Sequence, residues 1–207
     1  MTKKNLTAAE LKTLHNTNFF EVKASATKKI EHLFADVRDE IKKAIEENKI
    51  IFPAEVDSKN GKIFRGENYS GLPYLVLDYP KHFSKNSVFA FRTMFWWGNF
   101  FSCTLHLQGK ALEHLTPSPS PQGEGRFTPL RGKNIYVCVN NNPWGYHYKK
   151  DNYLPIDKLS DTELKKLLLE KEFVKLSRKI AIKDHKKLVK FSKESFLLFC
   201  SVLINKI

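Results

Sequence analysis

The chain has 207 residues, 42% of them hydrophobic and 13% aromatic, and its formal net charge is +13. This length corresponds to about one domain with a sizeable core, and the apolar content excludes a wholly disordered chain. No apolar run approaches the roughly 18 residues of a membrane span, and the first residues lack the apolar stretch of a secretory signal. We therefore expect a cytoplasmic protein without membrane contact.

The basic excess is concentrated toward the C-terminus, where residues 149–207 carry 15 basic and 8 acidic groups. Four lysines there stand at helical spacing and would share one face: Lys183, Lys186, Lys187 and Lys190. No aromatic residue stands among them to stack on bases. A solvated helix face is therefore favoured. The alternative is weak attraction to phosphates or to a membrane surface, and on the first of these rests weak nucleic-acid binding through this basic region.

Helical signals dominate the first 48 residues. Thr7 with Glu10 forms a capping-box pattern that predicts a short helix to about Leu14. From Val22 onward, apolar residues recur every three or four positions. This spacing predicts a longer amphipathic helix that ends near Asn48 and covers one face of a sheet.

Strand signals follow in the next segment. The sequence predicts a short strand at Lys49–Phe52, stopped by Pro53, and further strands at Lys62–Arg65 and Tyr74–Tyr79. Each is bounded by glycine, proline or polar turn residues, which are typical of connections between strands.

A hairpin is predicted where Gly98-Asn99 joins strands Val88–Trp97 and Phe100–Gln108. A two-residue turn there pairs residues whose numbers sum to 197. Phe95 would then lie opposite Ser102.

This register divides the hairpin between two faces. The first is apolar except for one arginine and is expected to face the core; it carries Val88, Ala90, Arg92, Met94 and Trp96 opposite Phe101, Cys103, Leu105 and Leu107. The second mixes large aromatics, among them Trp97, with hydroxyls and His106. It is either covered by a helix or lines a ligand pocket.

Residues 116–129 are rich in proline, serine and glycine, and their only large apolar residue is Phe127. Such a segment cannot fold alone. It resembles the translated form of repeat elements that are scattered between bacterial genes. A proline-rich recognition peptide is the less favoured alternative. We expect a flexible surface insertion within one domain.

Deleting residues 116–129 should change the melting temperature little, because the entropy of loop closure grows only slowly with loop length. Thermal unfolding of the deletion variant measures this. A loss of several degrees would show that Phe127 or its neighbours pack against the domain.

The last third of the chain mixes both kinds of signal. Asn134–Asn140 is predicted to be a strand, and a capping box at Ser160 opens a helical stripe that continues to Leu176. Ser192 is expected to cap a final helix, Phe196–Leu203. Together the signals predict a single α+β domain over residues 1–207. Its central, mainly antiparallel sheet would be packed by the N-terminal amphipathic helix and the C-terminal helices.

Arg92 is the most conspicuous polar residue, because an unpaired guanidinium within an apolar strand carries a large desolvation cost. Asp78 on the preceding strand would provide a structural partner, and a bound anionic ligand would provide a functional one. The structural pair is favoured. Arg65, beside Gly66 at a strand end, is a second candidate for ligand binding.

The aromatic segment 140–148 follows a strand, and its turn residues bracket Trp144. Its aromatic residues could lean over the mixed face, or Trp144 could only plug the sheet edge. His147 in this segment and His106 on the hairpin are the only acid–base candidates, since imidazole titrates nearest neutral pH. The candidate ligand-binding residues are thus Arg65, Arg92, Trp97, His106, Trp144 and His147.

Motifs for phosphate loops, nucleophile elbows and zinc proteases are absent from the sequence. The seven histidines lack metal-ligand spacing, and Cys103 and His106 would lie on opposite faces of a strand. The three cysteines are odd in number and widely spaced, so we expect them to be reduced and buried. We therefore assign no catalytic residue, no metal site and no cofactor.

These observations favour a non-catalytic domain that binds a small ligand or a protein partner, with a small anion as the candidate ligand. A small-molecule enzyme using His106 or His147 is the alternative, and nucleic-acid binding comes third.

The segment from Leu159 onward, with Phe173, Arg178 and a phenylalanine-rich final helix around Phe196, resembles the C-terminal part of the YktB-like bacterial proteins. The strand block with Phe-Ser-Lys-Asn and its aromatic strand pair is also similar to them. The resemblance implies a bacterial α+β protein, and it implies no mechanism because the activity of those proteins is unknown.

Overall fold

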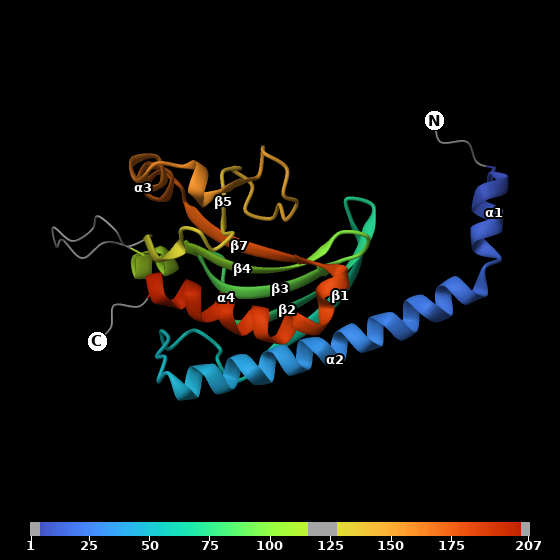
Figure 1. Cartoon of the computed structure of the whole chain (residues 1–207), viewed down its shortest axis with the longest axis horizontal. Coiled ribbons are helices and arrows are strands. Elements are labelled where there is room, and N and C mark those ends of the chain that lie inside the picture. Colours follow the sequence, from blue (N-terminus) through green and yellow to red (C-terminus); the bar gives the residue numbers. More distant parts are fainter. Residues whose placement is uncertain (1–4, 116–127, 204–207) are drawn as a thin grey trace.

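The computed structural model describes residues 5–115 and 128–203. They form an α+β domain in which α2 and α4 cover one face of an antiparallel sheet (Figure 1). The sheet order over this part of the chain is β1-β2-β3-β4-β7-β5-β6. The strands are Lys62–Tyr69 (β1), Leu72–Phe83 (β2), Ser87–Trp96 (β3), Phe100–Gly109 (β4), Tyr136–Cys138 (β5), Tyr153–Pro155 (β6) and Phe173–Ala181 (β7). The α-helices are Ala8–Leu14 (α1), Thr17–Glu47 (α2), Asp161–Glu170 (α3) and Leu188–Leu203 (α4).

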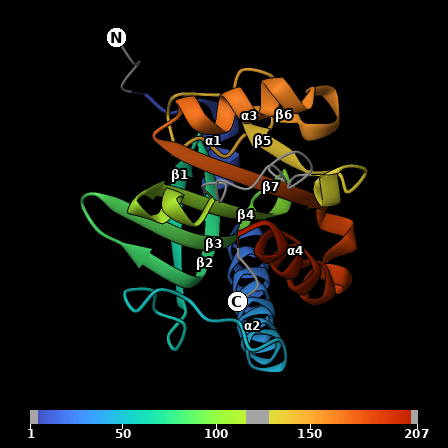
Figure 2. The ribbon, with the colours of Figure 1, turned by 90° about the vertical axis from the view of Figure 1, so that its left-hand side faces the viewer.

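The two faces of the sheet are covered by different parts of the chain. We call the face beneath α2 and α4 the inner face, and it holds the main hydrophobic core. The opposite, outer face is covered by residues 139–152, which connect β5 to β6. Helix α3 lies beside β5 and β6 at one edge of the sheet (Figure 2). None of the described helices is both long and apolar enough to cross a membrane.

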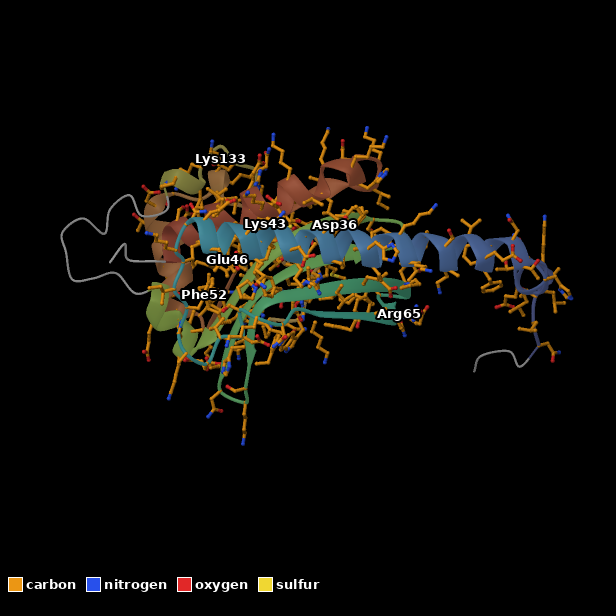
Figure 3. The ribbon with its side chains drawn as sticks, turned by 90° about the horizontal axis from the view of Figure 1, so that it is seen from below. Asp36, Lys43, Glu46, Phe52, Arg65 and Lys133 are labelled. Carbon is orange, nitrogen blue, oxygen red and sulfur yellow. The ribbon has the colours of Figure 1, made fainter. Side chains whose placement is uncertain are left out.

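Both N-terminal helices are confirmed, and the second is longer than expected. The capping box of α1 is formed by Thr7 and Glu10. Helix α2 begins at Thr17 because the side chain of Asn16 caps it by accepting a hydrogen bond from the Phe19 amide. The buried stripe of α2 starts only at Thr27. The N-terminal end of α2 continues beyond the sheet, past Arg65 at the sheet margin (Figure 3).

The predicted hairpin register is wrong by one residue, because Phe95 pairs with Phe101 rather than with Ser102. Gly98 has a φ of 69°, and the Asn99 amide donates to the Trp96 carbonyl at 3.0 Å. Gly98 thus occupies the third position of a four-residue turn, where a positive φ is required, instead of the second position assumed in the prediction. The loop between the paired residues Trp96 and Phe100 therefore has three residues and not the predicted two.

A shift of one residue moves every side chain of a strand to the other face. Phe91 and the other odd-numbered residues of β3 therefore face the inner core, alongside Cys103 and Leu105 of β4. Arg92 instead shares the outer face with Thr104 and His106. The predicted core face is therefore wrong for its β3 residues, Arg92 among them. It is confirmed for its β4 residues, which lie in the inner core: Phe101, Cys103, Leu105 and Leu107.

The predicted helix between Ser160 and Leu176 is also corrected, since α3 ends at Glu170 and β7 follows. Strand β7 pairs along the whole of β4. Val174 and Leu176 enter the inner core, whereas Lys175 lies on the opposite face, which is the alternation of a strand. Pairing with β4 therefore makes this segment a strand, although the spacing of its apolar residues also fits a helix.

Other predicted elements are corrected as well. Lys49–Phe52 is not a strand, because Lys49 adopts a φ of 50° and the chain there only closes the end of α2. The predicted strand Asn134–Asn140 is confirmed only at Tyr136–Cys138. Helix α4 starts before Ser192, which is buried within it.

The four C-terminal lysines do not share one continuous helix face. Three of them lie in a 3₁₀ segment, Ile182–Lys187, whose backbone leaves helical geometry at Asp184. Of the predicted insertion, residues 116–127 lie outside the described residues. Thr128–Leu130 form a 3₁₀ turn with Leu130 fully buried.

Candidate functional site

Arg92 and Asp78 form a bidentate ion pair at the centre of the outer face. Arg92 Nε and Nη2 donate to the two carboxylate oxygens of Asp78 at 2.7 and 2.8 Å. Nη1 donates to the Tyr146 hydroxyl at 2.6 Å. Burial alone would lower the pKa of Arg92, but Asp78 and Tyr146 outweigh burial and raise it. The favoured structural pair is therefore confirmed, and the charge of Arg92 is matched within the chain.

Lys175 is fully buried on the outer face. Its ammonium donates to the carbonyl oxygens of Pro143 and Gly145 at 2.8 and 2.6 Å, and it lies 4.1 Å from the centre of the Tyr146 ring. No carboxylate within ion-pair distance of Lys175 is found among the residues that the structure describes. Burial lowers the pKa of Lys175 to about 7. Lys175 therefore holds the backbone on both sides of Trp144.

The segment 139–152 is tied to the sheet at further points. The Tyr69 hydroxyl accepts hydrogen bonds from the backbone amides of Tyr146 and His147, at 2.5 and 3.2 Å. The Tyr148 hydroxyl lies 2.5 Å from Ser177 Oγ on β7. Because these contacts reach β1 and β7, the segment has a fixed position over the outer face. Of the two alternatives for this segment, the one in which its aromatic residues lie over the sheet holds for Tyr146 and Tyr148. The face that they cover carries Arg92 and not the predicted aromatic residues of β3.

His106 is buried on β4, between the rings of Trp144 and Phe173, at 5.4 and 6.0 Å between ring centres. Its Nε2 has no hydrogen-bond partner within the described chain. Burial, and after it the nearby charges of Lys175 and Arg92, lower the pKa of His106 to about 3. His106 is therefore neutral at physiological pH. By contrast, Trp144 leaves 47% of its surface exposed.

A hollow with a volume of about 550 Å³ lies beside Trp144 and the Arg92–Asp78 pair. We call it the Trp144 groove. It is lined by Glu55, Asp57, Lys62, Phe64, Asp78, Lys81, His82, Phe83, Arg92 and Trp144. Besides the central pair it contains the Lys81–Asp57 ion pair, at 3.0 Å. Hydrogen bonds from backbone amides, chiefly that of Asn60, and from Lys81 lower the pKa of Asp57 to about 2.

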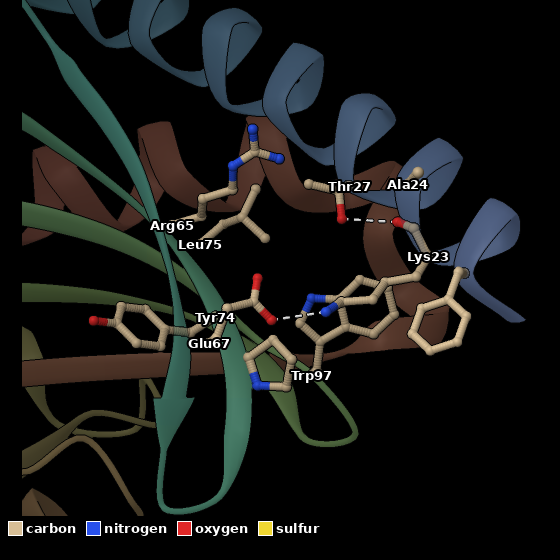
Figure 4. Close-up of a pocket in the computed structure, with 10 residues that line it drawn as sticks. Lys23, Ala24, Thr27, Arg65, Glu67, Tyr74, Leu75 and Trp97 are labelled. Atoms are coloured by element: carbon tan, nitrogen blue, oxygen red, sulfur yellow. Dashed lines mark hydrogen bonds and ion pairs between the residues drawn. The ribbon is translucent and has the colours of Figure 1, made fainter. Parts of the chain in front are cut away.

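A second hollow, of about 200 Å³, lies between the first turns of α2 and the ends of β1 to β3 (Figure 4). We call it the arm hollow. Arg65 and Trp97 line it together with Phe20, Lys23, Ala24, Thr27, Glu67, Pro73, Tyr74 and Leu75. Arg65 lies 4.0 Å from the Glu31 carboxylate.

The six predicted ligand-binding residues are therefore not brought together in one site. Arg92 and Trp144 line the Trp144 groove, and His106 lies under Trp144. Arg65 and Trp97 belong to the arm hollow. His147 lines neither hollow, and its Nδ1 is 3.9 Å from Asp151.

Sequence reasoning missed Lys175 and the groove residues of the loop before β1. Lys175 was missed because it fell within the predicted helix. The alternation of apolar and polar residues in Val-Lys-Leu-Ser is nevertheless typical of a strand. Asp57 and Lys81 are far apart in sequence and meet only through an isolated bridge between the loop and β2. No local sequence pattern predicts such a contact.

Comparison of the chain with protein-family models, with curated proteins and with solved structures finds no match in any of the three. Within residues 5–115 and 128–203, no three histidine, cysteine or acidic side chains gather as metal ligands.

Proposed function

We propose that this is a non-catalytic binding protein whose ligand occupies the Trp144 groove and stacks on the Trp144 indole. The observation that carries the proposal is that buried Lys175 fixes the two carbonyls on either side of an exposed tryptophan. Burying a lysine without a carboxylate partner is costly. Because the fold buries Lys175 despite this cost, and because Lys175 orients Trp144, the arrangement supports a binding role for the indole.

A fixed indole favours binding for two reasons. A ligand that covers the exposed part of Trp144 removes apolar surface from water, which is the main source of affinity for small molecules. Because Lys175 and Tyr69 already hold the loop, little conformational entropy remains to be lost when the ligand binds.

The charges of the groove indicate the ligand chemistry. Three carboxylates and three cations line it: Glu55, Asp57, Asp78, Lys62, Lys81 and Arg92. Such a balance favours a neutral polar or zwitterionic molecule with one flat face, and it does not favour a polyanion. The pairing of Arg92 with Asp78 also gives less support to a free anion at that position. Binding is favoured over acid–base catalysis because Trp144 and Phe173 enclose His106.

Ligand binding should depend on Trp144. Thermal-shift measurements with free amino acids, mono- and disaccharides and inorganic phosphate as probes test this, since a ligand of the folded state raises the melting temperature. A zwitterionic or neutral probe should raise it for the wild type, less for Trp144→Phe and not for Trp144→Ala. The matched control is Trp97→Ala, which changes the arm hollow and should keep the shift.

Two outcomes would contradict the proposal: a shift that survives Trp144→Ala, or stabilisation by phosphate alone. Lys175→Met adds a test of orientation, since it keeps the indole and removes the hydrogen bonds beside it. It should weaken binding by about tenfold, equivalent to about 1.4 kcal/mol. Unchanged affinity in this variant would exclude the assigned role of Lys175.

A further inference from the structure

The N-terminal arm, which we define as residues 6–26, projects beyond the sheet from its base, where Lys23 pairs with Glu67 of β1 (Figures 1 and 3). Six large apolar side chains on it are between 43% and 57% exposed: Leu6, Leu11, Leu14, Phe19, Phe20 and Val22. None of the seven residues of α1 is buried. A helix of this length is marginal in water without a packing surface. The arm therefore has the composition of a contact surface that the described chain does not cover.

The exposed apolar area of the arm suits an interface between proteins. An aromatic side chain offers roughly 150–250 Å² in total, so six half-exposed large side chains leave on the order of 500 Å² of apolar surface. That is near the upper end for a patch on a monomer. It is also most of the roughly 800 Å² that each partner contributes to a standard interface.

The arm hollow lies at the base of this surface (Figure 4). Its apolar lining includes Phe20 and Ala24 from α2, Leu75 from β2 and Trp97 from the turn after β3. The Lys23–Glu67 ion pair, at 2.7 Å, forms part of its rim. One chain thus carries leucine side chains at the tip of the arm and an apolar hollow at its base.

A twofold interface requires both contact surfaces on one chain, because each contact that one copy makes to the other is repeated by symmetry in the reverse direction. This chain has both, the leucines at the tip of the arm and the hollow at its base. The charges of the arm agree with this. Its only charged residues, apart from His15, are Glu10, Lys12, Glu21 and Lys23. A surface with equal numbers of acidic and basic groups does not repel a second copy of itself, and it does not favour a partner or membrane of one strong charge.

We propose that the arm hollow receives α1 of a second copy of this chain. Two arms run antiparallel, and Leu11 and Leu14 of each copy enter the hollow of the other. The exposed apolar residues of α2 then lie between the two chains.

Sedimentation velocity of the full chain over a wide concentration range should show a reversible dimer. Two variants remove opposite halves of the contact. The tip variant, Leu11→Ser with Leu14→Ser, loses the leucines, and Ala24→Trp fills the hollow. Each should raise the dimer dissociation constant at least tenfold. Ile51→Ser, at a residue that is 77% exposed elsewhere on the surface, is the matched control and should leave dimerisation unchanged.

Mixing the two variants gives the decisive result. The Ala24→Trp chain still has its leucines, and the tip variant still has an open hollow, so one of the two contacts can form between them. The mixture should therefore contain a 1:1 heterodimer at concentrations where each variant alone is monomeric. A wild type that stays monomeric, as it would if α1 folded back on its own chain, overturns the proposal. So does a mixture without heterodimer, or assembly into species larger than dimers. Melting temperatures near that of the wild type confirm that the variants fold.

Discussion

Asp78→Ala should lower the free energy of unfolding by about 3–5 kcal/mol, because it leaves the Arg92 guanidinium buried without its carboxylate. The hydroxyl of Tyr146 remains as a neutral acceptor for Nη1, whereas Nε and Nη2 each lose the carboxylate oxygen to which they donate. Urea unfolding monitored by circular dichroism measures the change.

The matched comparison removes both charges together. Asp78→Leu combined with Arg92→Met replaces the pair with apolar groups of similar size and should cost far less than Asp78→Ala alone. Asp39→Ala, which breaks an exposed pair with Arg38, should change stability by less than about 1 kcal/mol. If Asp78→Ala were as mild as Asp39→Ala, the pair would not be the electrostatic centre of the outer face.

Acid should destabilise the protein through His106. The folded-state pKa of His106 is lowered to about 3 from an ordinary value of 6.5, chiefly by burial. Below pH 6.5 the unfolded chain binds a proton at this residue and the folded protein does not. Stability is therefore fully present above pH 6.5 and falls as the pH approaches 3, by up to about 5 kcal/mol from this one residue.

The measurement is the free energy of unfolding as a function of pH for the wild type and for His106→Leu. The variant cannot titrate at this position, so the difference between the two profiles isolates His106 from carboxylates such as Asp57. We expect the variant to lose less stability between pH 6.5 and 3. The exposed His185, which lies outside the arm, is changed to leucine as the control. Parallel profiles for the wild type and His106→Leu would contradict the assignment.

The sequence was most informative where a local interaction decides the structure. The capping boxes at Thr7 and Ser160 were recognised because donor, acceptor and spacing all lie within four residues. The hairpin was recognised from Gly98, but its register was not. Whether a glycine takes the second or the third position of a turn depends on contacts of both strands with the rest of the sheet.

Strand β7 and the site depend on contacts between distant segments. Lys175 stands in a stretch whose helical spacing and strand alternation compete locally, and only pairing with β4 decides between them. The Asp78–Arg92 pair was predictable because both residues lie on consecutive antiparallel strands. The Trp144 groove was only partly predictable, because its other walls come from the loop before β1 and from the segment after β5.

The reactivity of the three buried thiols can be used to detect local opening of this fold. Cys103 lies on the inner face against Ser192 of α4, Cys200 lies on α4 itself, and Cys138 lies on β5 beneath the outer cover. Burial raises the pKa of Cys103 to about 11 and that of Cys200 above its ordinary range, so neither forms much reactive thiolate while it stays buried. A thiol reagent thus modifies these two cysteines only when their surroundings open. The order in which the three react separates detachment of the C-terminal helix from loss of the outer cover, without any introduced label.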